Sequence, residues 1–351
     1  MKKKYIIPVF VPHWGCKNEC TFCNQRNISG KQKPVTPEEV TDTVEYYLKS
    51  FKEENTDKEI AFFGGSFTGI ETDSQEALLK AAYKFIEEGK VQSIRVSTRP
   101  DYINKDILKL LKKYKVKTIE LGVQSTNNYI LKKCKRGHTY EDVKKASKLI
   151  KRMGFVLGHQ MMVGLPESTK LDDLNTAKTL AKLRPKIMRI YPVLVIKDTE
   201  LEKQYESGEY EPISLIQAVE ECKELYYFFT KKRINVIRIG LQSTDNISAP
   251  ENEASDVVAG PYHEAFRQLV NDEMWYDLIV EKIKKINSKV KEIEIHANKE
   301  DINSIVGHKK ENIDKLKKLY DVDTKVVQSD KIKKGKFELH IIKKYLDFLE
   351  E

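Results

Sequence analysis

One stretch near the N-terminus decides how this sequence is interpreted: Cys16-Lys17-Asn18-Glu19-Cys20-Thr21-Phe22-Cys23. Its three cysteines have the spacing C-x3-C-x2-C, and no fourth cysteine lies nearby in the sequence. Thiolates are soft ligands that suit zinc and iron–sulfur clusters. A cluster of four irons and four sulfides is usually held by four cysteines. Three thiolates would leave one iron open to a small molecule, as in catalytic metal sites, so the spacing predicts a cluster that takes part in chemistry.

A zinc site is the alternative interpretation of this loop. His13 lies three residues before Cys16 and could supply a fourth ligand. All four ligands would then be local, whereas small zinc sites usually join two separated pairs of ligands. The spacing therefore favours an iron–sulfur cluster held by the three cysteines of the loop. The other two cysteines, Cys134 and Cys222, lie in helical patterns, and we expect them to be packed thiols.

Short apolar segments alternate with amphipathic helical segments along most of the chain. This βα repetition indicates parallel strands with helical crossovers, and six units fit a partial (β/α)6 barrel. Thr36, Pro37 and Glu39 form a helix start with a capping box. Further helices are expected at Gln75–Glu88, Asp106–Tyr114, Tyr140–Met153, Asp172–Leu183 and Leu215–Lys232. Strands are expected at Ile6–Pro12, Glu59–Gly65, Ser93–Thr98, Thr118–Val123, Val156–Val163, Ile187–Ile196 and Val236–Leu241. The informative motifs follow these strands, where barrels place their sites.

The composition suits a globular protein of one large and one small domain. Hydrophobic residues make up 40% of the 351 residues and charged residues 33%, which argues against disorder. No apolar run approaches the length of a membrane span, and the apolar run after Lys4 is too short for a signal peptide. We therefore expect a cytoplasmic protein. The net charge of +9 makes polyanions such as RNA candidate partners.

The cysteine loop resembles that of the radical S-adenosylmethionine (SAM) superfamily, in which an aromatic residue, here Phe22, precedes the last cysteine. The resemblance covers most of the first 270 residues. More segments are similar to one branch of the superfamily, the catalytic subunit of the Elongator complex. These segments are Gly64-Gly65-Ser66-Phe67, Thr98-Arg99-Pro100-Asp101-Tyr102, Glu120-Leu121-Gly122-Val123-Gln124-Ser125, Arg136-Gly137-His138-Thr139, Met161-Met162-Val163-Gly164-Leu165-Pro166 and Arg189-Ile190-Tyr191-Pro192-Val193-Leu194-Val195-Ile196.

The resemblance implies a 4Fe-4S cluster on Cys16, Cys20 and Cys23 whose open iron binds the methionine moiety of SAM. An electron from a donor such as flavodoxin or ferredoxin would break the bond from the sulfonium to the 5′ carbon. The 5′-deoxyadenosyl radical would then remove a hydrogen atom from a substrate. The resemblance also implies contacts to SAM. Gly64, Gly65 and Ser66 would meet the methionyl amine, and Arg136 would pair with the methionyl carboxylate. Gln124 and Gln160 would reach the ribose, and Phe22 would lie beside the nucleoside.

Two features depart from the Elongator branch. Ser97 stands where the third-strand motif usually has glutamate. The branch also carries a C-terminal acetyltransferase domain, and the roughly 60 residues after the barrel are too few for one. We therefore predict modification of RNA, with tRNA as the leading substrate class, without transferring the acetyl chemistry. Coproporphyrinogen dehydrogenases share the Gly-Val-Gln-Ser and Arg-x-His patterns, so a small-molecule substrate is an alternative. An RNA-binding protein with a structural cluster is another.

The last part of the chain, residues 288–351, is predicted to be a small α+β domain with the order β-α-α-β-β. We place the boundary near residue 287 and expect the helical segment Pro261–Asn287 to belong to the barrel domain. The stretch Ile305-Val306-Gly307-x3-Glu311-Asn312-Ile313 resembles a KH domain, whose Gly-x-x-Gly loop clamps a nucleic-acid backbone. RNA contacts are therefore expected at Gly307, His308, Lys309 and Lys310.

Lys310 replaces the second glycine of that loop. A lysine there costs conformational freedom if the position needs a positive φ, but it adds a charge that attracts phosphate. A structural or dimerising role for the domain is the alternative. Tyr191, Lys197 and His263 are weaker candidates for substrate contacts.

Overall fold

The computed structural model describes residues 4–11, 15–16, 19–24, 33–51, 56–244, 246–286 and 290–344. It consists of two compact units, Met1–Glu264 and Ala265–Glu351. No helix in these ranges is both long and apolar enough to cross a membrane.

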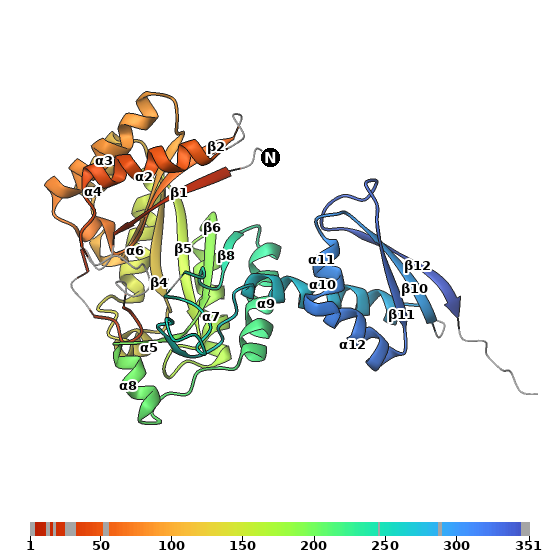
Figure 1. Cartoon of the computed structure of the whole chain (residues 1–351). Helices are drawn as coiled ribbons and strands as arrows, with labels where there is room; N and C mark the ends of the chain where they lie inside the picture. Colours follow the sequence, from red (N-terminus) through yellow and green to blue (C-terminus); the bar gives the residue numbers. More distant parts are fainter. Residues whose placement is uncertain are drawn as a thin grey trace, which may run out of the picture. The chain divides into compact units, whose positions relative to one another are not determined.

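The first unit is built on a sheet of seven strands that are all parallel, in the order β1-β2-β3-β4-β5-β6-β8 (Figure 1). Each strand therefore ends at the same edge of the sheet. This confirms the predicted α/β partial barrel, with the strand after the sixth unit completing the sheet. The strands are β1 (Lys4–Val11), β2 (Asp57–Gly64), β3 (Ser93–Thr98), β4 (Val116–Gln124), β5 (Val156–Val163), β6 (Ile187–Pro192) and β8 (Asn235–Ile239).

The strand predicted at Ile187–Ile196 is broken in the structure. β6 ends at Pro192, and β7 (Val195–Ile196) leaves the large sheet to pair antiparallel with β9 (Val257–Ala259). Pro192 has no N–H to continue the ladder, so the apolar run Val193–Ile196 was wrongly assigned to one strand. The segment instead packs beside the cysteine loop, because Val193 and Val195 share an apolar cluster with Cys20.

Helices cross from one strand to the next, and their starts follow the predicted chemistry. Thr36 accepts the N–H of Glu39 at 3.2 Å, and Glu39 accepts the N–H of Thr36 at 3.0 Å, which confirms the capping box. Two short helices, Asn128–Lys133 and Glu200–Glu206, were not predicted from the sequence. The helices are α2 (Pro37–Ser50), α3 (Thr72–Glu87), α4 (Lys105–Lys113), α5 (Asn128–Lys133), α6 (Tyr140–Arg152), α7 (Lys170–Lys182), α8 (Glu200–Glu206) and α9 (Leu215–Lys231), with 3-10 turns η1 (Phe67–Gly69) and η2 (Pro100–Tyr102).

The two faces of the sheet differ in chemistry because successive strand residues point to opposite sides. On β4, Ile119 and Leu121 are buried on the face toward the helices. His159 of β5 pairs with Leu121 and its Nε2 lies 2.9 Å from Ser147 Oγ of α6, which places this face against the helices. The opposite face of β4 carries Glu120 and Gln124, so the inner face of the partial barrel is polar.

The second unit confirms the predicted order β-α-α-β-β. A three-stranded sheet has the order β11-β10-β12, with β11 parallel and β12 antiparallel to β10. Its elements are α10 (Phe266–Lys284), β10 (Val290–Ala297), α11 (Ile302–Val306), a 3-10 turn η3 (His308–Lys310), α12 (Glu311–Tyr320), β11 (Asp323–Gln328) and β12 (Phe337–Lys344).

Helix α10 belongs to this second unit, whereas we expected it to belong to the barrel. Trp275 and Ile279, four residues apart on one helix face, pack in the same core as Ile293 and Ile295 of β10. The division therefore lies between residues 264 and 265 rather than near 287. The change in composition near residue 287 marks where helix gives way to strand within one core.

Candidate cofactor site

The cysteine loop lies at the carboxyl edge of the large sheet. It follows β1, whose last residue, Val11, pairs with Gly64 at the end of β2. The Cys16 thiol donates to Ser66 Oγ at 3.3 Å, and Arg136 Nη1 donates to Cys20 Sγ at 3.0 Å. The loop thereby contacts the segments that follow β2 and β4, which are far apart in the sequence.

A glycine allows this close approach. Gly15 has a φ of +78°, and a Cβ on it would lie 2.3 Å from the Ser66 carbonyl oxygen and 2.6 Å from the Ile70 N. Any other residue would push the cysteine loop away from the turn after β2. The start of the loop is thus fixed by backbone contact with the segment that carries Ser66.

The chemistry of the donors fits an iron–sulfur cluster on Cys16, Cys20 and Cys23. All three are free thiols, and Cys20 is buried beside the Arg136 guanidinium, a cation of the kind that stabilises thiolates. In the described ranges, no three His, Cys, Asp or Glu side chains gather as ligands of a single metal ion would. His13, the fourth ligand of the zinc alternative, lies outside the described residues.

The other two cysteines are packed thiols, as predicted. Both side chains are fully buried. Burial raises the pKa of Cys134 to about 12 and raises the pKa of Cys222 well above its usual value. Both therefore remain protonated, and neither has the thiolate character of a metal ligand.

Two residues expected to contact SAM, Arg136 and Gln124, lie together next to Gly122, and Arg136 contacts Cys20. Arg136 Nη2 donates to the Gly122 carbonyl oxygen at 2.6 Å, which holds the guanidinium in place. A Cβ on Gly122 would lie 3.3 Å from Gln124 Nε2 and 3.5 Å from Arg136 Nη2. Gln124 has a φ of +71°, a backbone conformation that residues other than glycine rarely adopt. Its Oε1 is buried and has no hydrogen-bond partner within the described part of the chain. Such an acceptor is costly unless a ligand satisfies it.

The Gly64-Gly65-Ser66 segment lies on the other side of the loop. Gly64 has a φ of +99°, which explains a glycine at the end of β2. Ser66 is buried and accepts from the Cys16 thiol. Residues after β2 and β4 therefore flank the cysteine loop from two sides.

Gln160 and Phe22 are placed differently from this group. Gln160 Nε2 donates to Ser97 Oγ at 3.3 Å and to Glu120 Oε2 at 3.2 Å, inside the barrel. Ser97, the departure from the Elongator branch, therefore helps to orient Gln160. The Phe22 ring is buried in an apolar cluster that also contains Cys20 and Ile130, and Cys23 packs against this cluster.

Sequence reasoning missed a buried ion network on the inner face. Glu120 is fully buried and accepts from Arg95, from Arg189 Nε at 2.5 Å and from Gln160. Arg95 also pairs with Glu59 at 2.6 Å. Burial alone would raise the pKa of Glu120, but Arg189 and Arg95 hold it below its usual value. Arg95, Glu120 and Arg189 each lie two residues beyond the position in register with the preceding charge, so the sequence alone carries no signal of their pairing.

Arg189 links this network to two aromatic residues, Phe63 and Tyr191. Its guanidinium lies 4.9 Å from the centre of the Phe63 ring, and Nη1 donates to the Tyr191 hydroxyl at 3.3 Å. Tyr191, a weak candidate from the sequence, thus lies on the inner face. Lys197 Nζ instead donates to the Ser255 carbonyl oxygen at 2.5 Å.

Two further cationic or aromatic groups surround the cysteine loop. Arg99 is buried and pairs with Asp101 through two hydrogen bonds of 3.0 Å. Burial, with Arg136 and Arg99 nearby, lowers the pKa of His138 to about 3, so its ring is neutral. Asp101 compensates the charge of Arg99, whereas Arg136 directs its guanidinium to Cys20.

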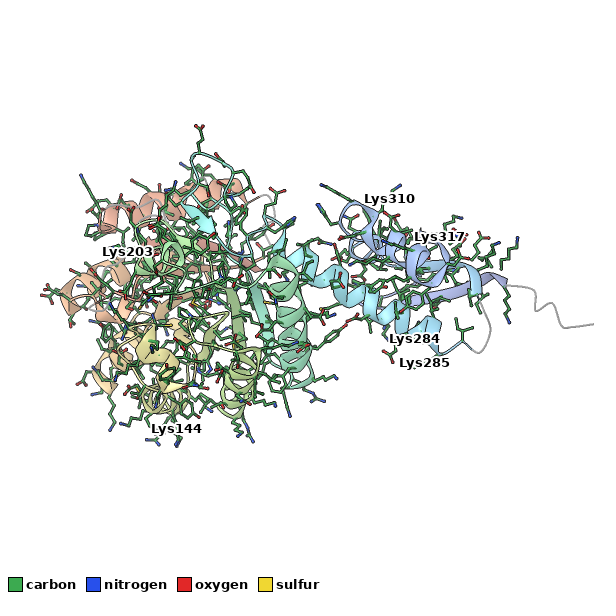
Figure 2. The ribbon with its side chains drawn as sticks, turned by 90° about the horizontal axis from the view of Figure 1, so that it is seen from below. Lys144, Lys203, Lys284, Lys285, Lys310 and Lys317 are labelled. Carbon is green, nitrogen blue, oxygen red and sulfur yellow. The ribbon has the colours of Figure 1, made fainter. Side chains whose placement is uncertain are left out.

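The backbone of the predicted RNA-contacting loop has positive φ values at Gly307, Lys309 and Lys310. Gly307 has a φ of +81°, and a Cβ there would lie 2.9 Å from the Asn312 N. Lys309 and Lys310 have φ values of +50° and +70°, so the lysine at the second glycine position does pay a conformational cost. Both lysine side chains are exposed. Figure 2 shows Lys310 and Lys317 extending outward from the second unit.

Comparison with known proteins agrees with this geometry. The model of the Radical SAM superfamily matches residues 11–180, and that of the Radical_SAM C-terminal domain matches residues 185–276. The tRNA uridine(34) acetyltransferase of Methanocaldococcus infernus is 33% identical over 186 residues, covering 47% of this chain and 35% of that protein. An uncharacterised protein of Methanocaldococcus jannaschii is 30% identical over 220 residues, covering 60% of this chain and 67% of that protein.

Among solved structures, the archaeal Methanocaldococcus infernus Elp3 with an N-terminal deletion is similar. It has a TM-score of 0.62 and 25% identity, covering 80% of this chain and 64% of that one. The chain spans about a third of the length of the tRNA uridine(34) acetyltransferases that it matches. Its fold, its cysteine loop and these matches show that the chain belongs to the radical SAM superfamily, whose enzymes use a 4Fe-4S cluster and SAM.

Proposed function

We propose that this protein cleaves SAM reductively at a 4Fe-4S cluster and uses the resulting radical to modify RNA, with tRNA as the substrate class. The observation that carries the proposal is the contact of the three-cysteine loop with Ser66 on one side and Arg136 on the other. When bound, the cluster and SAM supply the electron transfer and the 5′-deoxyadenosyl radical. The protein supplies ligands, orientation and exclusion of water.

The roles of the surrounding residues follow from their positions. Arg136 is fixed by the Gly122 carbonyl oxygen, so its planar fork can pair with the methionyl carboxylate. The backbone and hydroxyl of Gly64, Gly65 and Ser66 would receive the methionyl amine. The unsatisfied Oε1 of Gln124 would accept a ribose hydroxyl.

Gln160 would act from within the barrel. Its amide nitrogen is engaged by Ser97 and Glu120, which leaves its Oε1 to accept the other ribose hydroxyl. Phe22, which packs in an apolar cluster with Cys20, would lie beside the nucleoside, as expected from its position in the motif.

RNA is proposed as the substrate for two reasons. The relative from Methanocaldococcus infernus is named for its action on a tRNA uridine. The second unit also presents Lys309 and Lys310 on an exposed loop after the fixed turn at Gly307, as a phosphate-contacting loop requires.

The proposal is tested by anaerobic incubation of the reconstituted, reduced protein with SAM and total tRNA, followed by mass spectrometry of the nucleosides. We expect one nucleoside to change mass with wild-type protein and no change with Cys20→Ala. Cleavage of SAM without any altered nucleoside would refute the RNA substrate and leave a small-molecule substrate to be sought.

A further inference from the structure

Positive charge gathers at the turns that lead from four helices of the barrel into the next strands. The helices α4, α6, α7 and α9 precede β4, β5, β6 and β8, which are neighbours in the sheet (Figure 1). Aspartate and glutamate are absent from residues 107–119, 143–166, 174–197 and 225–244, which contain the four turns. The exposed cations of these turns, here called the basic edge, are Lys112, Lys113, Lys115, Lys117, Lys151, Arg152, Lys182, Arg184, Lys186, Lys231, Lys232 and Arg233.

The basic edge forms one continuous surface. Because the four strands are parallel and adjacent, they all begin at the amino edge of the sheet and extend over three strand spacings, about 14 Å. Hydrogen bonds also link one turn to the next. Lys112 Nζ donates to the Met153 carbonyl oxygen at 3.3 Å, and Lys151 Nζ donates to the Leu183 carbonyl oxygen at 2.7 Å.

Most charges of the basic edge have no anionic partner. Lys113 pairs with Glu76 at 2.7 Å, but the other members make no ion pair in the part of the chain that the structure describes. Helix dipoles favour cations in the last helical turn, but Lys117 and Lys186 lie beyond the helix ends. Neighbouring like charges repel one another and disfavour the folded state, and a bound anion would remove this repulsion.

Three members of the basic edge occupy backbone positions that favour glycine. Lys115, Arg184 and Arg233 follow α4, α7 and α9, and their φ values are +56°, +53° and +58°. At the corresponding position after α6, Gly154 has a φ of +86°. A side chain in this conformation lowers stability relative to glycine. The three turns therefore keep a positive charge despite its conformational cost.

The position of the basic edge indicates what kind of anion it suits. β4 has nine residues, so the amino edge lies about 30 Å from the edge that carries the cysteine loop. An electron donor must approach the cluster and would not dock at this distance. A small anion needs converging donors, whereas these cations are exposed and spread over four turns. A row of exposed cations instead matches the repeated phosphates of a nucleic-acid backbone.

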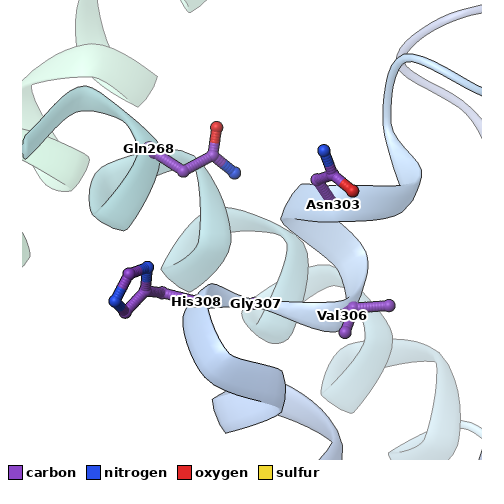
Figure 3. Close-up of a pocket in the computed structure, with 5 residues that line it drawn as sticks. All are labelled: Gln268, Asn303, Val306, Gly307 and His308. Atoms are coloured by element: carbon purple, nitrogen blue, oxygen red, sulfur yellow. The ribbon is translucent and has the colours of Figure 1, made fainter. Parts of the chain in front are cut away.

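The cavity in the second unit has no comparable charge. Lysine and arginine are absent from the residues that line it (Figure 3). The lining residues are Gln268, Asn303, Val306, Gly307 and His308. The cavity therefore adds no cation to those of the loop at Lys309 and Lys310.

We propose that the basic edge is a second RNA-contacting surface, which binds phosphates of the RNA far from the nucleotide that reacts. The inference rests on the proposed RNA substrate and goes further, because it assigns part of the RNA affinity to the side of the barrel opposite the cysteine loop. Lys115, Arg184 and Arg233 would contact phosphate, and Lys117 and Lys186 would extend the surface along the strand starts.

The test measures binding of fluorescently labelled tRNA to the full-length reconstituted protein by anisotropy, over a series of salt concentrations. The first variant is Lys115→Gly/Arg184→Gly/Arg233→Gly, which removes three charges and relieves three strained turns. The matched control, Lys80→Gln/Lys109→Gln/Lys145→Gln, removes three exposed charges from the middle of α3, α4 and α6. A second variant, Lys117→Gln/Lys186→Gln, removes charge without altering the turns.

We expect the triple glycine variant to bind tRNA at least about tenfold more weakly at low salt. Its slope of log affinity against log salt should fall by about two to three charges. Its melting temperature should equal or exceed that of wild type, and its formation of 5′-deoxyadenosine without RNA should not change. Lys117→Gln/Lys186→Gln should change affinity and slope in the same direction, whereas the control should keep the wild-type slope.

Three results would overturn the proposal, and they differ in what they leave standing. Equal weakening in the triple glycine variant and the control would assign the effect to net charge. Wild-type affinity in both basic-edge variants, with weak binding by Lys309→Glu/Lys310→Glu, would exclude the basic edge and leave RNA binding to the second unit. If wild-type protein binds no tRNA, the proposed RNA substrate fails together with the basic edge.

Discussion

The two units of this protein use charge in opposite ways. In the barrel, Glu59, Arg95 and Glu120 are buried and paired across neighbouring strands. In the described part of the second unit, the buried charged residues are Asp272 and Asp301, and most of the lysines are exposed. That unit has 19 lysines and arginines against 17 aspartates and glutamates, so the placement of charge on its loop, rather than its total, would direct RNA binding.

Buried and exposed charges differ in how exactly their side chains must be placed. A buried ion pair must keep its geometry, because removing one partner leaves an uncompensated charge. Exposed charges contribute little to stability and are screened by salt, but they attract a polyanion from any direction. We therefore expect substitutions of buried charges in the barrel to affect folding and SAM cleavage, and substitutions of exposed charges to affect RNA binding.

The largest expected effect on stability is that of Glu120→Ala. Loss of the carboxylate leaves Arg95 without one partner and Arg189 uncompensated, so the free energy of unfolding should fall by about 3–5 kcal/mol. Urea denaturation monitored by circular dichroism measures it. Glu206→Ala, an exposed glutamate on α8, is the control and should change stability by less than about 0.5 kcal/mol. Equal effects in the two variants would contradict the contrast between buried and exposed charge.

Arg136→Lys should separate cofactor binding from folding. Lysine keeps the charge but loses the fork that pairs with a carboxylate. We expect the KM for SAM to rise by about 10- to 100-fold, with the cluster absorbance retained. Lys135→Arg, the exposed neighbour, should leave the KM unchanged. An unaltered KM in Arg136→Lys would remove Arg136 from the proposed site.

The third prediction concerns pH. Burial, together with the neighbouring Asp173 carboxyl, raises the pKa of Glu221 to about 8. Because the folded state favours the protonated acid, its contribution to stability is complete below the usual pKa of 4.5 and is lost as the pH rises toward 8. The melting temperature should fall over this interval. Glu221→Gln should flatten that part of the profile, whereas the control Glu224→Gln should keep the slope. A profile unaffected by Glu221→Gln would show that the pair is not protonated in the folded state.

The smallest expected effect is that of Lys310→Gly in the loop. Lys310 has a φ of +70°, so glycine should stabilise the protein by about 0.5–1 kcal/mol. The same variant should lower the slope of log affinity for RNA against log salt by about one charge. Lys318→Gly, in the exposed face of α12, should instead destabilise by about 1 kcal/mol. Stabilisation by neither variant, or by both, would contradict the account of the turn.

The sequence predicted the barrel well because each βα unit carries its own local signals. Ser93–Thr98 and Val156–Val163 are strands with the predicted bounds, since apolar runs between turns define them. The cysteine loop was likewise visible as a local motif. The position of Lys310 in a positive-φ turn was anticipated from the missing glycine, and the backbone shows it.

What the sequence could not show depends on contacts between distant segments. Glu59, Arg95, Glu120 and Arg189 come from four strands, and their pairing follows from the register of the parallel sheet. The membership of α10 in the second unit likewise depends on Trp275 packing against β10. Neither contact has a local sequence signal, because the partners lie far apart in the chain.

The central claim is that the three-cysteine loop holds a cluster that reduces SAM. Its most direct test is the measurement of 5′-deoxyadenosine after anaerobic reduction of the reconstituted protein with SAM, for wild type and Cys20→Ala. The account predicts 5′-deoxyadenosine and a brown iron–sulfur chromophore with wild type, and neither with the variant. Bound zinc in place of iron, or no 5′-deoxyadenosine from iron-loaded wild type, would contradict it.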